Sequence, residues 1–257
     1  MEYLIICLVA MLGSGLTLFS GFGLGTILVP VFAIFFPIDL AIVLTAIVHF
    51  LNNIFKIVLL GKSANLKITL RFGLPAFFAA FIGAKVLQYV SHVQPLIRYS
   101  LFDETFEITW IKIVIASLMI IFALVDLIPR FAKISFNGKY LPLGGVLSGF
   151  FGGLSGNQGA LRSMFLIRIG LSKEAFIATG VLIACLIDIS RLSVYFSNFS
   201  KVETNLNYTL LFMATASAFL GAFLGSKLVK KVTYKTVQTI VAMMLLVFSL
   251  LLGLGII

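Results

Sequence analysis

Several polar and ionisable side chains of this 257-residue chain lie inside apolar segments, where they could bind or conduct ions. The first group follows the spacing i, i+4, i+7, i+8 and i+11 and comprises Thr45, His49, Asn52, Asn53 and Lys56. This spacing puts all five on one face of an α-helix. Ionisable residues in membrane spans cost about 2.5–3.5 kcal/mol each on insertion scales, so they normally face a bundle interior or an aqueous cavity. The stripe therefore predicts a polar path between helices.

A second apolar segment carries an acid and a base three residues apart, Asp188 and Arg191. Their spacing indicates either a wall of the same path or a structural ion pair, and both interpretations stay open. His49 and Asp188 are the candidates for coupling protons to transport, because histidine titrates near neutral pH. A neutral, hydrogen-bonded His49 is the alternative. For Lys56 the favoured interpretation is a side chain that extends to the inner membrane interface.

Arg162 lies three residues after Gly159, near the start of a short apolar segment. If that helix begins inside the membrane, its dipole and free N–H groups add to the guanidinium charge and favour a bound anion. Arginine also holds oxyanions through forked donors better than lysine does. Pairing of Arg162 with Asp188 is the alternative.

Two glycine-containing breaks interrupt the apolar pattern, about half the chain apart. They are Gly21-Phe22-Gly23-Leu24-Gly25 and Ser155-Gly156-Asn157-Gln158-Gly159. Such breaks are typical of discontinuous helices at transporter binding sites. The predicted substrate-binding residues are Ser20, Gly21, Gly23, Gly25, Asn52, Asn53, Ser155, Gly156, Asn157, Gln158, Arg162 and Arg191. The polar side chains at the breaks could equally satisfy backbone groups that the broken helices leave free.

Composition defines the elements that must position these residues. The chain is 61% hydrophobic and 11% charged, with a mean hydropathy of +1.16, and its apolar segments recur along the whole length. We therefore expect an all-α polytopic membrane protein. The net charge of +10 is spread over segment ends, which predicts contact with lipid headgroups and no nucleic-acid partner.

The motifs that would indicate an enzyme or a pump are missing from the sequence. Cys7 and Cys185 lie in apolar runs without a Cys-x-x-Cys pair, and we interpret them as small buried side chains. No zinc, P-loop or serine-triad spacing occurs. The sequence thus predicts no metal, no cofactor and no enzymatic activity.

The apolar segments form two similar series. The first has a span at 3–19, a half-helix at 26–36 that is too short to cross a ~30 Å core, and full spans at 40–60, 66–90 and 110–128, with a polar loop at 92–107. The second has a short run at 143–154, a half-helix at 160–169, and full spans at 175–196, 208–229 and 237–257. We expect two membrane repeats, residues 1–129 and 141–257, joined by a cytoplasmic linker at 130–140.

Residue matches and loop charges indicate how the repeats are related. Ala76, Phe77, Phe81, Gly83 and Lys85 correspond to Ala218, Phe219, Phe223, Gly225 and Lys227. Corresponding loops carry opposite charge patterns, so the positive-inside rule places them on opposite sides of the membrane. The sequence therefore predicts inverted-topology repeats. Each has a broken or re-entrant short-helix pair followed by three full transmembrane helices, and both termini lie outside.

Together these features resemble the TauE/SafE family of sulfite exporters and organosulfonate permeases, over nearly the whole chain. Gly21, Gly23, Gly25 and Pro30 match the glycine cluster and following proline of that family, as do Ala41 and Thr45. The second half departs from the pattern, with Ser155, Asn157 and Gln158 in place of glycines and Met164 in place of proline.

The resemblance implies a secondary transporter in the cell (inner) membrane that exports sulfite, a small sulfonate or a related anion by alternating access. A channel-like path for another oxyanion is one alternative. A membrane-embedded enzyme or an assembly factor is another. A coupling proton or sodium ion and a homodimer are left open as further partners.

Overall fold

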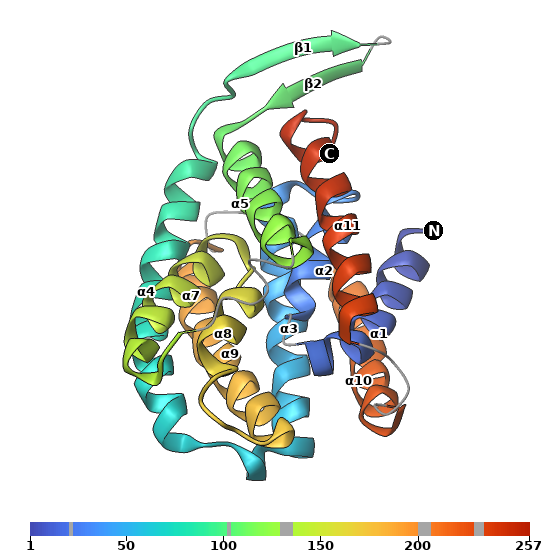
Figure 1. The fold of residues 1–257 in the computed structure, drawn as a ribbon. Helices are drawn as coiled ribbons and strands as arrows, with labels where there is room; N and C mark the ends of the chain where they lie inside the picture. Colours follow the sequence, from blue (N-terminus) through green and yellow to red (C-terminus); the bar gives the residue numbers. More distant parts are fainter. Residues whose placement is uncertain (21–22, 102–103, 129–135, 200–206, 229–233) are drawn as a thin grey trace.

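The computed structural model describes residues 1–20, 23–101, 104–128, 136–199, 207–228 and 234–257, and its described elements are helices with one β-hairpin (Figure 1). Three parts of the sequence discussed above lie outside this description: Gly21, residues 130–135 of the expected linker, and residues 200–206. The helices of the first half are α1 (Glu2–Ser20), α2 (Leu24–Ala33), α3 (Ile38–Leu60), α4 (Leu66–Ser91) and α5 (Trp110–Leu127). Those of the second half are α7 (Leu141–Ser155), α8 (Gly159–Leu166), α9 (Lys173–Phe199), α10 (Tyr208–Leu228) and α11 (Tyr234–Gly253).

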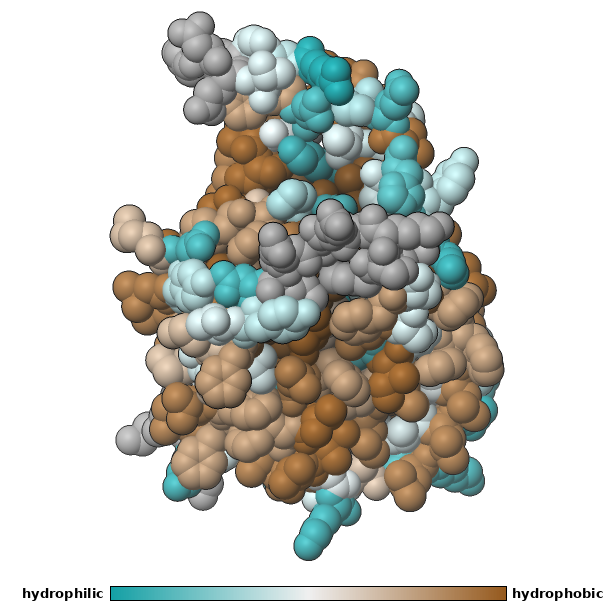
Figure 2. All heavy atoms as spheres, turned by 180° about the vertical axis from the view of Figure 1, so that it is seen from behind, coloured by the Kyte–Doolittle hydropathy of each residue, from teal (hydrophilic) through white to brown (hydrophobic). Residues whose placement is uncertain are grey.

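Four helices among the described residues are long and apolar enough to cross a membrane, namely those over Ile38–Ser63, Leu66–Ser91, Lys173–Ser197 and Tyr208–Lys227. They coincide with four of the six predicted full spans. The other two predicted spans correspond to α5 and α11, whose apolar parts, Trp110–Val125 and Thr239–Gly253, are shorter. Apolar side chains cover much of the lower body in Figure 2, and hydrophilic side chains gather at the upper end and the lower rim.

The two predicted half-helices are present and are short. Helix α2 has 10 residues and α8 has 8, so at about 1.5 Å per residue neither can cross a ~30 Å hydrocarbon core. Helix α7 ends at Ser155 and is capped by Gly156, whose φ of 78° is a left-handed conformation that glycine adopts without a steric cost. This residue turns the chain back into α8 within the bundle.

Two parallel helix pairs with glycine-rich contacts hold the bundle together. In the pair of α4 and α7, a Cβ atom added to Gly149 would lie 2.1 Å from the carbonyl oxygen of Ala76. In the pair of α1 and α10, one added to Gly221 would lie 1.9 Å from the carbonyl oxygen of Met11. Helix association in lipid depends on such close backbone approach, because burial of apolar surface gives little driving force there.

Buried apolar side chains fill the space between these pairs. The larger core cluster joins α2, α3, α5 and α11 and includes Phe32, Ile42 and Ile115. A smaller cluster around Phe72 and Phe165 joins α4 to α8. The half-helices α2 and α8 are thereby anchored on longer helices.

A β-hairpin replaces the polar loop that was expected at 92–107, so the all-α prediction was wrong there. Strands β1 (Ile97–Leu101) and β2 (Glu104–Ile108) pair antiparallel, with Arg98 opposite Glu107. Tyr99 and Phe106 lie opposite each other on the two strands, and their rings stack. The Tyr99 hydroxyl donates a hydrogen bond to the carbonyl of Leu254. The hairpin therefore lies at the same end of the bundle as the C-terminus (Figure 1).

Candidate functional site

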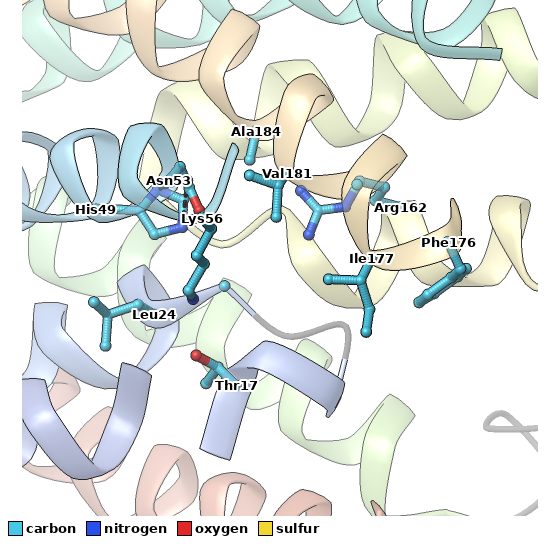
Figure 3. A pocket seen from close by; sticks show the side chains of 12 residues that line it. Thr17, Leu24, His49, Asn53, Lys56, Arg162, Phe176, Ile177, Val181 and Ala184 are labelled. Atoms are coloured by element: carbon cyan, nitrogen blue, oxygen red, sulfur yellow. Dashed lines mark hydrogen bonds between the residues drawn. The ribbon is translucent and has the colours of Figure 1, made fainter. Parts of the chain in front are cut away.

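A small cavity of about 30 Å³ lies between the first helix break and helices α3, α8 and α9 (Figure 3). Its wall consists of Thr17, Gly23, Leu24, His49, Asn53, Lys56, Arg162, Phe176, Ile177, Gly180, Val181 and Ala184. Four of the predicted site residues are on this wall: Gly23, His49, Asn53 and Arg162. Three residues of the stripe on α3, namely His49, Asn53 and Lys56, thus face this internal space.

Two basic side chains project into the cavity from opposite walls, Lys56 from α3 and Arg162 from α8 (Figure 3). Both are buried, with 4% and 7% of their surfaces exposed. The interpretation of Lys56 as a side chain extending to the membrane interface was therefore wrong. Its place on the stripe with His49 and Asn53 directs it into the bundle.

The amide of Asn52 holds Lys56 in this position. In the orientation of the amide that gives both its oxygen and its nitrogen a partner, the oxygen accepts a hydrogen bond from the Lys56 ammonium at 3.2 Å. The nitrogen then donates to the Ala218 carbonyl at 3.2 Å. The Ser14 hydroxyl lies 3.0 Å from the same amide. Asn52 is fully buried behind the cavity wall, so it positions a wall residue instead of lining the cavity itself.

The carboxylate of Asp188 joins α9 to the stripe on α3. Its Oδ2 atom lies 2.7 Å from Nδ1 of His49 and accepts a hydrogen bond from Nδ2 of Asn53 at 3.2 Å. A proton on Nδ1 of His49 satisfies this geometry and leaves Nε2 facing the first helix break. The sequence predicted these residues as site members but gave no sign that they touch.

Asp188 also forms an ion pair with Arg191 on the same helix. Its Oδ1 atom lies 3.0 Å from Nε and 2.8 Å from Nη2 of Arg191, and both residues are fully buried. The structural ion pair, one of the two interpretations of this spacing, is therefore formed. Arg191 lies behind the cavity wall.

The two helix breaks meet in the middle of the bundle. A Cβ atom on Gly25 would lie 3.2 Å from the carbonyl oxygen of Gly156, and one on Gly156 would lie 3.0 Å from Nη1 of Arg191. A Cβ atom on Gly23 would lie 3.0 Å from Nε2 of His49. The glycines thus let the backbone of both breaks approach the His49–Asp188–Arg191 network.

The polar side chains of the second break do not reach the cavity wall. Ser155 donates to the Phe151 carbonyl at 2.9 Å and accepts from the Asn157 backbone N–H at 3.3 Å, so it satisfies backbone groups, as one of the two interpretations held. Oδ1 of Asn157 and both amide atoms of Gln158 are buried without a hydrogen-bond partner in the described structure. The side chain of Ser20 is not described.

Sequence reasoning missed eight of the twelve wall residues, and the three that bear on the chemistry are Lys56, Thr17 and Gly180. Lys56 was on the recognised stripe, and the stripe was the signal that could have assigned it to the cavity. Thr17 comes from the last turns of α1, and Gly180 of α9 lies against Arg162, where an added Cβ atom would be 3.3 Å from Nε. No sequence signal marks either as part of a site.

A buried basic cavity among membrane-length helices, flanked by two meeting helix breaks, defines a polytopic membrane protein of the transporter class. The described residues contain no group of three His, Cys, Asp or Glu side chains placed to hold a metal ion. Residues 6–252 match the family model described as sulfite exporter TauE/SafE, and the chain belongs to this family of membrane transport proteins. No curated protein and no solved structure matches the chain.

Proposed function

We propose that the protein is a secondary transporter that exports sulfite or a small sulfonate by alternating access. The observation that carries the proposal is the cavity with Arg162 on its wall inside a membrane-embedded bundle. A forked guanidinium binds an oxyanion through paired N–H donors, and the low dielectric of the site strengthens that attraction. The family description, sulfite exporter, agrees with this substrate class.

In this proposal the bound anion contacts Arg162, and Gly23 and Asn53 line the same cavity. Gly25, Gly156 and the backbone around them supply N–H groups where the two breaks meet. Asn52 and Arg191 act from behind the wall, the first through Lys56 and the second through Asp188. Ser20, Gly21, Ser155, Asn157 and Gln158 belong to the two breaks, and the last three lie behind the cavity wall in this structure.

Two inverted halves, residues 1–129 and 141–257, provide the alternating movement. Support comes from the helix pairing, because α1 packs parallel to α10 just as α7 packs parallel to α4. Each pair joins the first helix of one half to the fourth helix of the other. The α1–α2 pair also enters the bundle from the upper end in Figure 1 and the α7–α8 pair from the lower end.

The charges of the described loops favour one orientation in the cell membrane. The connection between α3 and α4 and the first turn of α4, at the lower end in Figure 1, carry Lys62 and Lys67 and no acid. The hairpin and both termini lie at the upper end. By the positive-inside rule the lower end faces the cytoplasm and both termini lie outside.

Proteoliposome counterflow tests the proposed function. Liposomes loaded with unlabelled sulfite should accumulate labelled sulfite, and Arg162→Ala should abolish this uptake together with the thermal stabilisation that sulfite gives the purified protein. Arg168→Ala, an exposed arginine two residues after α8, is the matched control and should retain both. Stabilisation by sulfite that survives Arg162→Ala would place the site elsewhere. Turnover of a substrate without any counterflow would favour a membrane-embedded enzyme.

A further inference from the structure

The two amide side chains of the second helix break are buried without partners. Oδ1 of Asn157 and both amide atoms of Gln158 have no hydrogen-bond partner in the described structure. Only 5% and 1% of these two residues are exposed. A polar group that stays buried and unpaired destabilises a fold. These amides therefore require a reason other than stability.

The cavity described above lies toward the lower end of the bundle. Its wall uses residues 49–56 in the second half of α3 and residues 176–184 in the first half of α9. Helix α3 runs from the upper end to the lower end and α9 runs back (Figure 1), so both halves are the lower ones. The upper halves of the two helices are tightly packed, with Ile42 and Arg191 fully buried. The matching region toward the upper end is thus filled.

The proposed relation between the two halves gives these amides the same place as residues of the first break. One shift along the chain superimposes identical residues, namely Ser14 on Ser148, Gly15 on Gly149, Gly25 on Gly159, Ala41 on Ala175 and Thr45 on Thr179. The same shift carries Gly23 onto Asn157 and Leu24 onto Gln158. Gly23 and Leu24 line the lower cavity. The amides thus hold the positions that would line a matching pocket on the upper side.

Helix α2 lies between the second break and a recess at the upper end of the bundle (Figure 1). Val29 of α2 contacts the second break, since a Cβ atom on Gly156 would lie 3.5 Å from its Cγ2 atom. Just after α2, Phe36 lines the recess of about 510 Å³, together with the first turns of α3 and α5. Phe36 packs on the fully buried Phe32, with ring centroids 6.1 Å apart. A shift of this short helix would therefore join the recess to the second break.

We propose that Asn157 and Gln158 line a second anion-binding pocket, which opens toward the upper end when the present cavity closes. This inference rests on the proposed function, because it describes the other state of the alternating movement. Nε2 of Gln158 offers an N–H donor to a bound oxyanion, and the first N–H groups of α8 follow directly after this residue. The amide oxygens then meet the water that enters with the anion.

The upper pocket binds the anion more weakly than the lower cavity in this proposal. The shift that relates the halves carries Leu28 onto Arg162, so the upper pocket has no counterpart of that guanidinium. Asp188 and Arg191, in the upper half of α9, pair with each other and add no net charge. Neutral amide donors hold an oxyanion less tightly than a guanidinium does. Weaker binding would speed release on the upper side, as export requires under the proposed orientation.

The accessibility of single cysteines from each membrane face tests the inference. In a protein whose Cys7 and Cys185 are replaced by alanine, Gln158→Cys should react with a membrane-impermeant thiol reagent added at the face of the upper end. Thr17→Cys, on the wall of the present cavity, should react only from the opposite face. Ser148→Cys, at a fully buried position of α7, is the control and should react from neither face.

Transport measured separately at each face tests the role of the Gln158 amide. In liposomes that hold the protein in one orientation, Gln158→Leu should raise the half-saturating sulfite concentration at the upper face about tenfold, the effect of one hydrogen bond to a charged group. At the lower face the change should stay below about twofold. Thr215→Val is the matched control and should behave as the wild type, because Thr215 also has a buried hydroxyl without a partner in the described structure but lies on α10.

The outcomes separate this inference from the proposed function. Gln158→Cys that reacts from neither face, in a protein that exchanges sulfite, would overturn the inference and leave the proposed function standing. An equal rise at both faces in Gln158→Leu would assign the amide to the present cavity and would also overturn it. If the wild type exchanges no sulfite, the proposed function fails and this inference fails with it.

Discussion

Nδ1 of His49 lies 2.7 Å from Oδ2 of Asp188, although 139 residues separate them in the chain. The contact joins α3 of the first half to α9 of the second, directly beside the first helix break. It belongs to a buried network in which Asp188 also holds Asn53 and Arg191. Movement of α3 relative to α9 would have to break the contacts of Asp188 with His49 and Asn53, which links the network to both transport and stability.

The first prediction concerns coupling through His49. If this residue transfers the coupling proton, His49→Gln should still allow counterflow of sulfite, because exchange needs no driving ion, but should lose uphill accumulation driven by a pH gradient. Labelled-sulfite uptake with and without an imposed gradient measures both quantities. Exposed His92→Gln is the control. Uphill accumulation that persists in His49→Gln would contradict proton coupling at this residue and point to another proton carrier, such as Asp188.

The second prediction concerns the Asp188–Arg191 ion pair. Asp188→Asn leaves the fully buried Arg191 without a counter-ion, which should cost about 3–5 kcal/mol of stability. Thermal unfolding of the purified protein measures this, with exposed Glu174→Gln on the same helix as the control. Adding Arg191→Met to Asp188→Asn should recover part of the loss. A double variant less stable than Asp188→Asn would indicate that Arg191 has another essential partner.

The third prediction concerns the contact of α4 with α7. An added Cβ atom on Gly149 would lie 2.1 Å from the Ala76 carbonyl oxygen, so Gly149→Ala must push the two helices apart. We expect a loss of about 1–3 kcal/mol, as for other overpacked sites. Gly138→Ala is the control, because nothing lies within 4 Å of its added Cβ atom. Equal melting temperatures for the two variants would contradict the close contact.

The fourth prediction concerns membrane orientation. Ser63 and Ser100 are exposed at opposite ends of the bundle, and each can be replaced by cysteine with little change of shape. With Cys7 and Cys185 replaced by alanine, a membrane-impermeant thiol reagent added to intact cells should label Ser100→Cys and leave Ser63→Cys unlabelled. Permeabilised cells should show both labelled. The reverse pattern would invert the proposed topology and place both termini in the cytoplasm.

Much of the fold could be predicted from local signals in the sequence. Apolar segment lengths located α3, α4, α9 and α10, because a membrane span needs a continuous apolar run whatever its neighbours are. Glycine clusters located both helix breaks for a similarly local reason. The β-hairpin was missed because its alternating pattern covers only five residues a strand among polar neighbours.

The residue types of the site could also be predicted from sequence, since polar groups in membrane spans must face the protein interior. The stripe on α3 followed from that rule, and the special position of Arg162 followed from its place just after the second helix break. Asp188 and Arg191 lie within one helical turn of each other, so a structural ion pair was one of the two interpretations that their spacing allowed. These are properties of single helices, for which spacing along the chain is sufficient.

Only the tertiary structure decided which of these side chains share a space. The packing of α3 against α9 placed Asp188 on His49, and the contacts of Asn52 with α1 and α10 turned Lys56 inward, away from the membrane interface. Such contacts join residues far apart in the chain. They depend on how whole helices pack, which no local spacing specifies, and they convert a glycine-rich break into one wall of a basic cavity.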